Sequence, residues 1–304
     1  MNKHQNSIIV TGATGYIGSS FLKFINEKNI YIRTFGRKKF KDFDNKYFNF
    51  QNMNISDEDI KGFKYLIHFA SISHTNIKDD TVAKRNILEP TIFLAEKAIK
   101  NNLKKFIYIS SVKSIDVIKT DNEFKKNKLF HDIYSKYKKI TEKKLLNLFN
   151  GLETKLIIIR PALVYGGNEK GNLKILTTYI KNSPLVLLPY INNNKSMVHL
   201  ENLIQSINLI TFDDNIKENQ FNILDRCNYS FVDICNAINL KFNRKIYFIK
   251  IPNFLVIILF KIESLLKLNF LRKIFVNEIY PRSNIEKYGF KQKKDISNLY
   301  EESH

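Results

Sequence analysis

The sequence predicts an α/β fold in which a doubly wound parallel sheet is joined by a smaller, interleaved C-terminal lobe. Two observations support this prediction. Short, continuously apolar segments alternate with segments of helical apolar spacing through the first half of the chain, a pattern typical of a parallel sheet covered on both faces. The first apolar segment also runs directly into a glycine-rich turn at residues 11–18.

The expected elements of the sheet follow one another as alternating strands and helices. After the glycine turn, Ile17, Phe21, Phe24 and Ile25 recur with the spacing of one helix face. The later apolar runs are too short for helices and are bounded by turns, which favours strands. We expect strands at 7–10, 30–35, 65–69, 106–109 and 156–159, and helices at 15–27, 86–101 and 132–149.

The regular alternation ends at Pro161, after which loops rich in Gly and Asn and a helical C-terminus follow. We expect residues 1–165 to form the sheet domain, with 196–220 returning to it. Residues 166–195 and 221–304 would form the smaller lobe over the carboxyl edge of the sheet, where ligands bind in such folds.

Composition restricts the class of protein. With 304 residues, of which 44% are hydrophobic, the chain can bury a substantial core. The net charge of +20 comes from lysines spread over every segment, so no focused patch predicts nucleic-acid binding. Two cysteines without metal-ligand spacing fit a reducing compartment. The first six residues leave no room for a signal peptide, and we expect a cytoplasmic protein.

The most apolar segment lies at residues 254–260 and is followed by Lys261, Glu263 and Lys267. It is shorter than the ~20 residues that span a bilayer, so no transmembrane helix is expected. Two interpretations remain: a packed C-terminal helix, or an amphipathic helix that rests on the inner face of the membrane with the help of the positive charge.

The glycine turn predicts a site for a pyrophosphate. Gly12, Gly15 and Gly18 follow a strand and open a helix. The missing side chains permit a tight turn, and the N-H groups and dipole at the start of the helix attract anions.

Tyr134 and Lys138 form a candidate proton-transfer pair. Four residues apart on a helix, they share one face. An ammonium beside the phenol favours its ionised form, which brings a group with an ordinary pKa near 10 toward use at neutral pH.

The turn at 11–18 resembles the TGxxGxxG loop of the short-chain dehydrogenase/reductase superfamily, and later segments resemble its extended branch, the NAD-dependent epimerase/dehydratase family. The resemblance covers about residues 7–290. Its further motifs are 68–71 (HFAS), Asn86, Ser110-Ser111, Tyr134, Lys138, Arg160-Pro161, Tyr165-Gly166, 171–173 (GNL), 192–200 (NNNKSMVHL) and Asn202.

This resemblance implies a Rossmann-type domain and a catalytic set of Ser111, Tyr134 and Lys138. Tyr134 would exchange a proton with a sugar hydroxyl or carbonyl, Lys138 would lower its pKa and bind the nicotinamide ribose, and Ser111 would bind the same substrate oxygen. Ser110 is expected to be a structural residue at the strand end.

The resemblance also implies a dinucleotide cofactor. The end of the second strand reads Phe35-Gly36-Arg37-Lys38, without the carboxylate that NAD-preferring domains use. NADP is therefore favoured over NAD, with Arg37 as the anchor and Arg33 as a helper. No metal is expected, and the cofactor-binding residues would be Gly12, Thr14, Gly15, Tyr16, Ile17, Gly18, Arg37, Asn54, Ile55, Phe69, Ala70 and Lys138.

For a nucleotide-sugar substrate, the resemblance points to Asn172 and Lys195. Many relatives carry Arg at the position of Lys195. Lysine keeps the positive charge there but cannot form the paired hydrogen bonds of a guanidinium. Arg282 is a second basic candidate, and His199 is expected to be structural.

The resemblance implies NADPH-dependent 4-keto reduction of a UDP-4-keto-6-deoxyhexose, such as an N-acetylated one, in surface-polysaccharide biosynthesis. A UDP-hexose 4-epimerase that retains NAD is the alternative; against it, Lys113 stands where epimerases commonly carry Thr. A non-catalytic NAD(P)-binding sensor or scaffold is the second alternative, and a homodimer is expected from the family.

Overall fold

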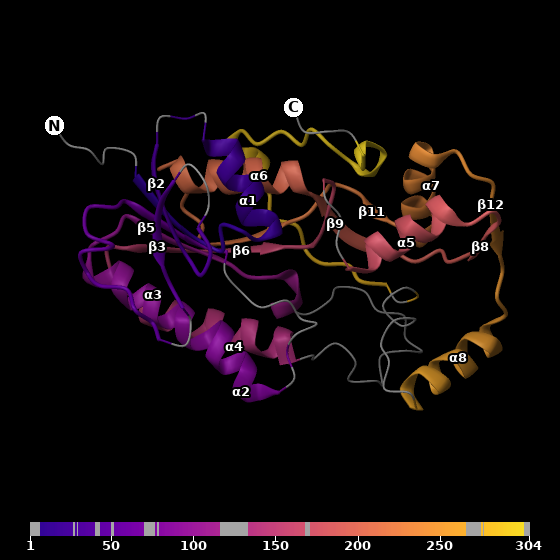
Figure 1. The fold of residues 1–304 in the computed structure, drawn as a ribbon, viewed down its shortest axis with the longest axis horizontal. Coiled ribbons are helices and arrows are strands. Elements are labelled where there is room, and N and C mark those ends of the chain that lie inside the picture. The colour runs from indigo at the N-terminus through magenta and orange to yellow at the C-terminus, as the bar shows by residue number, and fades with distance from the viewer. Residues whose placement is uncertain are drawn as a thin grey trace.

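The chain folds into a parallel sheet with helices on both faces and, at one end of it, a smaller lobe (Figure 1). The predicted α/β class with a doubly wound sheet is confirmed. The computed structural model describes residues 7–26, 28, 30–39, 43–49, 52–69, 77, 79–115, 133–167, 171–265, 275 and 277–300.

The main sheet has seven strands in the order β10-β6-β5-β4-β1-β2-β3, and every neighbouring pair runs parallel. The strand order reverses between β1 and β4, so that the loops after these strands diverge at the carboxyl edge and leave room for a ligand. The strands are β1 (Ser7–Thr11), β2 (Tyr31–Gly36), β3 (Asp44–Tyr47), β4 (Tyr65–His68), β5 (Lys105–Ile109), β6 (Lys155–Pro161) and β10 (Gln220–Ile223).

The sequence analysis does not predict β3. Its residues Asp44, Asn45 and Lys46 form no apolar run, because β3 lies at the edge of the sheet and is only partly covered. The central strands β1, β4 and β5 are buried at every position, and for them the apolar runs are a sufficient signal.

Helices cover the two faces of the sheet (Figure 1). On one face, α1 and α6 contact each other and enclose a core that includes Phe21, Leu22 and Leu203. On the other face, α3 and α4 enclose a core that includes Leu94 and Leu145. These helices are α1 (Tyr16–Ile25), α3 (Glu89–Lys100), α4 (Ile133–Leu148) and α6 (Leu200–Phe212).

A longer helical region than predicted precedes α3. It consists of α2 (Asp80–Ala83) and the π-helix η2 (Lys84–Leu88). The Asn86 side chain lies in this π-helix and donates a 2.9 Å hydrogen bond to the carbonyl of Val82.

Within the described residues, two small sheets and three α-helices form the body of the lobe. One sheet has the order β11-β9-β7 and the other pairs β12 with β8. Helices α5 and α7 pack together over a core that includes Ile180, Ile234 and Ile238. The elements are β7 (Leu163–Tyr165), α5 (Gly171–Asn182), β8 (Val186–Pro189), β9 (Lys195–His199), β11 (Asn228–Tyr229), α7 (Phe231–Phe242), β12 (Ile246–Ile249) and α8 (Asn253–Leu265).

Short 3-10 helices complete the described chain: η3 (Val112–Ser114), η4 (Ile285–Tyr288) and η5 (Ile296–Asn298). Within the described ranges, no helix has the length and apolar character needed to cross a membrane.

A buried ion pair fastens α4 to the sheet. The Arg160 guanidinium on β6 makes hydrogen bonds of 2.7–3.0 Å to the Glu142 carboxylate on α4, and both side chains are about nine-tenths buried. Arg160 also donates to the side chains of Gln220 and Asn222 on β10. Ser114 of η3 donates to Glu142 at 2.7 Å. One charge pair therefore connects four segments of the sheet domain.

Arg160→Met should lower the free energy of unfolding by about 3–5 kcal/mol, because it leaves the Glu142 carboxylate buried without its cation. The double variant Arg160→Met/Glu142→Leu should be less destabilised than this single variant, since no uncompensated charge remains. Urea unfolding of both variants measures the difference, and a double variant that is less stable than Arg160→Met would contradict this account.

Candidate functional site

The glycine turn is shaped for close backbone contacts. Gly12 has a φ of +73°, which side chains rarely permit, and the Gly15 N-H donates to the Gly12 carbonyl at 2.9 Å. A Cβ at Gly18 would lie only 2.3 Å from that carbonyl oxygen. The turn therefore requires glycine at these positions for steric reasons.

The same turn leaves the start of α1 open to solvent. Thr14 and Gly15 are exposed, and the N-cap residue Gly15 has no side chain to cover the first N-H groups of the helix. Tyr16 donates a hydrogen bond to the carbonyl of Gly166 at the end of β7, and Ile17 packs against the core. These features fit a pyrophosphate at the helix N-terminus.

Lys138 is held on the inner side of α4, facing the sheet. Its ammonium donates a 2.9 Å hydrogen bond to the Ile109 carbonyl at the end of β5, and the side chain is 1% exposed. The ammonium nitrogen lies 5.6 Å from the ring centroid of Tyr134 and 4.6 Å from that of Tyr108. The predicted Tyr134–Lys138 pair is thus brought together beside the end of β5.

Burial controls the charges around this pair. It lowers the pKa of Lys138 to about 7, an effect that Glu142 partly opposes. Burial and the Lys138 charge lower the pKa of His68 to about 3. His68 is therefore neutral, and it lies between the hydroxyls of Thr11 and Thr91 at 2.7 and 3.0 Å.

Ser111 lies in the turn that follows β5. Its hydroxyl accepts a 3.2 Å hydrogen bond from the Lys113 N-H and so caps η3, while the side chain remains half-buried. Ser110, one residue earlier, is 5% exposed. Because η3 contacts α4, the Ser111 turn borders the helix that carries Tyr134.

The basic residues expected to bind the cofactor, Arg37 and Arg33, differ in their exposure and in their contacts. Arg37 and Lys38 are exposed just after β2. Arg33, the expected helper, is committed elsewhere: its guanidinium bonds Asp44 at 2.6 Å and the Asp59 carbonyl at 2.8 Å.

The residues expected near the adenine and the nicotinamide lie on either side of the sheet edge. Asn54 is exposed, and its side-chain amide donates to the Tyr47 carbonyl and accepts from the Asn49 N-H. Ile55 is buried in the core under α3. Phe69 is half-buried with its N-H on the Thr11 carbonyl, whereas Ala70 lies outside the described residues.

Lys195 is a buried cation on β9. Its ammonium lies 3.8 Å from the Glu278 carboxylate, and burial lowers its pKa. Glu278 opposes this shift, and the positive charge of Lys113 adds to it. Asn172 lies at the start of α5, but its side chain is outside the described part. Arg282 is committed to the Leu224 carbonyl and to Glu286.

His199 has the structural surroundings expected of it. It is the N-cap of α6, its Nδ1 accepting from the Glu201 N-H at 3.2 Å. Its ring lies edge-on to Tyr165, whose hydroxyl donates to the buried Asp225 at 2.5 Å. Burial raises the pKa of Asp225, and this network connects β7 with the start of α6 and with the segment that follows β10.

Two site residues were not selected as ligand-binding residues in the sequence analysis. Lys113 was treated only as a departure from the epimerase pattern, and Glu278 was not considered. Glu278 pairs with Lys195 across about 80 residues of sequence, and nothing local in the sequence signals this contact. Among the described residues, no group of three or more His, Cys, Asp or Glu side chains could hold a metal ion.

The chain resembles known proteins in both sequence and structure. The family model described as the 3-beta hydroxysteroid dehydrogenase/isomerase family matches residues 9–233. A UDP-glucose 4-epimerase of Vibrio cholerae is 29% identical over 219 residues, 67% of this chain and 66% of that protein. The aligned part is thus just under two thirds of that relative.

A second relative, an N-acetyl-alpha-D-glucosaminyl-diphospho-ditrans,octacis-undecaprenol 4-epimerase of Escherichia coli O157:H7, is 21% identical over 253 residues, 82% of this chain and 76% of that one. Among solved structures, a short-chain dehydrogenase/reductase superfamily protein from Agrobacterium tumefaciens with bound NAD has a TM-score of 0.74 at 12% identity, covering 97% of this chain and 95% of that one. At this identity the likeness is one of fold.

Lys138→Met should make the folded chain more stable near neutral pH. The ammonium has a pKa of about 7 in the folded chain against 10.5 unfolded, so the unfolded state binds more protons between these values. Wild-type stability therefore falls as the pH drops from 10.5 to 7. We expect the variant to exceed wild type by on the order of 2 kcal/mol at pH 7, with a smaller gap at pH 9.5.

Urea unfolding at the two pH values measures this gap. Lys139→Met, an exposed position on the same helix, is the control and should show no such pH dependence. A Lys138→Met variant that is less stable than wild type at pH 7 would contradict the assignment of a strained, buried ammonium.

Proposed function

Because this chain belongs to the 3-beta hydroxysteroid dehydrogenase/isomerase family, and with it to the extended short-chain dehydrogenases/reductases, we propose that it is an NAD(P)-dependent 4-epimerase of a nucleotide-linked hexose. The observation that carries the proposal is the buried Lys138 ammonium beside the Tyr134 ring, at the carboxyl end of β5. Both relatives are 4-epimerases. For this reason we place 4-epimerisation ahead of the 4-keto reduction that the sequence analysis expects.

The glycine turn would hold the pyrophosphate of the cofactor. Gly12, Thr14, Gly15, Tyr16, Ile17 and Gly18 supply the turn and the open start of α1. Lys138 would also bind the nicotinamide ribose, beside Phe69 and Ala70, and Ile55 and Asn54 would flank the adenine. When bound, the nicotinamide supplies the acceptor and donor of hydride for C4 of the sugar.

The protein's own part is proton transfer and orientation. Tyr134 would accept the proton of the C4 hydroxyl as hydride leaves C4, and return it to the same oxygen when hydride comes back on the other face. Ser111 would donate a hydrogen bond to that oxygen and keep it at the phenol. The positive charge of Lys138 stabilises the ionised phenol.

The substrate diphosphate would lie near Lys195 and Lys113. Lys195 has Glu278 as its acidic partner at 3.8 Å, and the charge of Lys113 also acts on it; a diphosphate would add negative charge at these two cations. Asn172 would contribute from the start of α5. We keep the division into a sheet domain (1–165 with 196–220) and a substrate lobe (166–195 and 221–304) as part of the proposal.

A UDP-linked substrate follows from the Vibrio relative, whereas the Escherichia coli relative acts on a sugar carried by undecaprenyl diphosphate. Both carriers present a diphosphate, which is the group that the two lysines would bind. We also propose a homodimer and a cytoplasmic location; the free thiols of Cys227 and Cys235 fit a reducing compartment.

A second candidate function is NADPH-dependent reduction of a UDP-4-keto-6-deoxyhexose. The exposed Arg37 and Lys38 after β2 favour it, because they suit a ribose 2'-phosphate, and a reductase consumes its cofactor. Conversion of UDP-glucose to UDP-galactose without added cofactor supports the epimerase, whereas NADPH loss with the 4-keto sugar, and no such conversion, supports the reductase.

Tyr134→Phe should lower kcat by roughly 10²–10⁴-fold in whichever of these assays wild type is active, because the phenol that transfers the proton is lost. Tyr137→Phe removes a hydroxyl from the same helix, three residues on, and should change kcat less than twofold. Full activity of Tyr134→Phe would refute the catalytic assignment, and wild type that binds NAD(P) but is inactive in both assays would favour a sensor or scaffold.

Arg37→Ser should weaken NADP binding about tenfold or more and leave NAD binding within twofold, since only NADP carries the extra phosphate. Lys39→Ser, an exposed neighbour in the same turn, is the matched control. Titration calorimetry measures both cofactors, and equal NADP affinity in Arg37→Ser and wild type would remove Arg37 from the cofactor site.

A further inference from the structure

Helix α8 carries an unusually apolar exposed surface for a water-facing helix. Its exposed apolar side chains have between 40% and 83% of their surface open to solvent: Phe254 62%, Leu255 40%, Ile257 47%, Ile258 47%, Ile262 48% and Leu265 83%. The sequence analysis leaves open a packed C-terminal helix or one that rests on a membrane. The packed alternative does not account for these exposed fractions.

The exposed residues of α8 share one face. At 3.6 residues per turn they fall within an arc of about 160° around the helix axis. Val256 and Leu259, on the other side, are half-buried. The helix is therefore apolar on both of these sides, and one of its apolar faces lies open to solvent.

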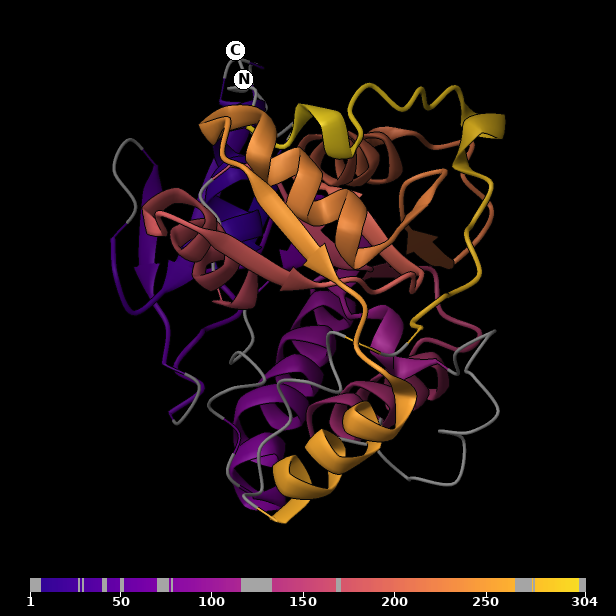
Figure 2. The same ribbon diagram turned by 90° about the vertical axis from the view of Figure 1, so that its right-hand side faces the viewer.

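A second set of exposed apolar residues lies on the small sheet that precedes α8 in the chain. In the sheet formed by β8 and β12, Leu187 lies opposite Tyr247 in register, and both are exposed. Leu185 and Ile249 are also about half-exposed. The sheet lies between α7 on one side and α8 on the other (Figure 2), and its buried face packs toward α7.

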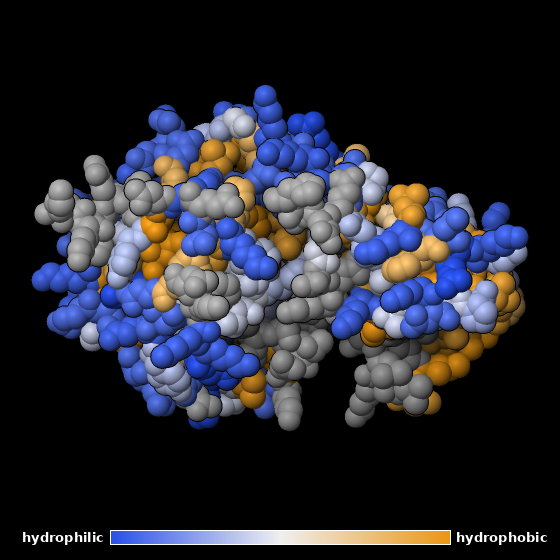
Figure 3. All heavy atoms as spheres, turned by 45° about the horizontal axis from the view of Figure 1, so that its top comes forward, coloured by the Kyte–Doolittle hydropathy of each residue, from blue (hydrophilic) through white to orange (hydrophobic). Residues whose placement is uncertain are grey.

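Together these residues define what we call the outer surface of the lobe: the exposed face of α8 with Leu185, Leu187, Tyr247 and Ile249. Figure 3 shows apolar side chains gathered at the end of the molecule that carries β8, β12 and α8. Exposed apolar side chains that gather at one end of a molecule mark an interaction site.

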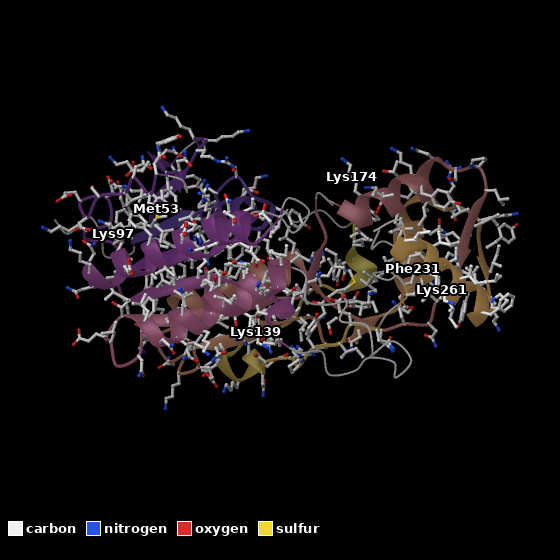
Figure 4. All side chains as sticks on the ribbon, turned by 90° about the horizontal axis from the view of Figure 1, so that it is seen from below. Met53, Lys97, Lys139, Lys174, Phe231 and Lys261 are labelled. Carbon is white, nitrogen blue, oxygen red and sulfur yellow. The ribbon has the colours of Figure 1, made fainter. Side chains whose placement is uncertain are left out.

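Positive charge accompanies the apolar residues. Segments 171–191 and 241–265 contain seven Lys or Arg residues and only one acidic residue, Glu263. Lys250 is exposed beside Tyr190, and Lys261 is exposed within the apolar arc of α8. Lys174 on α5 belongs to the same lobe (Figure 4). Basic residues next to an exposed apolar helix face are the signature of an interfacial helix.

We propose that the outer surface of the lobe docks the protein peripherally on an anionic lipid membrane. With 13 residues, α8 is about 20 Å long, too short to cross a hydrocarbon core of about 30 Å but long enough to lie in the interface. Its apolar side chains would enter the headgroup boundary, and the lysines would contact anionic headgroups.

A lipid surface fits these residues better than a second copy of the chain. The core of a protein interface is depleted of lysine, whereas Lys261 lies inside the apolar arc. Two copies that met through this surface would also bring their clustered positive charges together. Docking rests on residues outside the proposed catalytic set and does not depend on which reaction the protein catalyses.

The chain contains no tryptophan, so one introduced indole reports on this surface alone. Phe254→Trp in the full-length protein is expected to show a blue-shifted emission with vesicles of phosphatidylcholine and phosphatidylglycerol at 3:1. The shift should be much weaker with phosphatidylcholine alone and should fall in 0.5 M salt. Leu152→Trp, an exposed leucine in the turn after α4, should show no shift with either.

Vesicle flotation of further variants tests each component. Leu255→Gln/Ile258→Gln should weaken binding at least tenfold on both vesicle types, and Lys250→Gln/Lys261→Gln about tenfold on anionic vesicles alone. Both variants should melt near the wild-type temperature and keep wild-type turnover of soluble substrate, so failure of docking and failure of the proposed reaction are distinguishable.

Three results would overturn the proposal: wild type that does not float with anionic vesicles, an unchanged affinity in Leu255→Gln/Ile258→Gln, or the same blue shift in Leu152→Trp. A wild-type dimer that these glutamine substitutions convert to monomer would also overturn it, since a second copy would then cover the surface.

Discussion

The buried ion pair between Glu142 and Arg160 is the constraint on which the candidate site depends. It fixes α4 to β6, it receives the Ser114 hydroxyl from the turn that carries Ser111, and through Arg160 it reaches β10. One helical turn before Glu142, the Lys138 ammonium lies at the end of β5, beside the Ile109 carbonyl and the rings of Tyr108 and Tyr134. A buried ammonium at this place lowers the stability of the fold. The Glu142–Arg160 ion pair holds α4, and with it Lys138, in this position.

The surroundings of Lys138 determine the charge on this side chain and on its neighbour His68. His68 is kept neutral between two threonines, so it does not compete as a cation. With a pKa of about 7, Lys138 is poised to gain or lose its charge near neutral pH, and a bound ligand that excludes water or adds negative charge will shift that balance. We therefore expect the electrostatics of the proposed proton-transfer pair, Tyr134 and Lys138, to depend on what occupies the sheet edge.

The sequence was most informative where local rules decide structure. Continuous apolar runs predicted the central strands, and the glycine spacing predicted a turn whose close contact at Gly18 is visible as a 2.3 Å approach of a hypothetical Cβ. Edge strand β3 was missed because it is half-covered and polar. The ion pair of Lys195 with Glu278 was beyond prediction, because it depends on how the lobe returns to the sheet. Arg33 shows the same limit of local reasoning. Its place in the sequence suggested a contact with the cofactor, whereas in the fold its guanidinium pairs with Asp44.

The central claim is that C4 of a nucleotide sugar loses and regains its own hydride at this site, with the proton handled by Tyr134. The most direct measurement is to follow deuterium in UDP-[4-²H]glucose by mass spectrometry and NMR during turnover by the wild-type protein. The account predicts UDP-galactose that retains deuterium at C4. Product in which the C4 deuterium has exchanged with solvent, or the absence of any C4-inverted product, would contradict it.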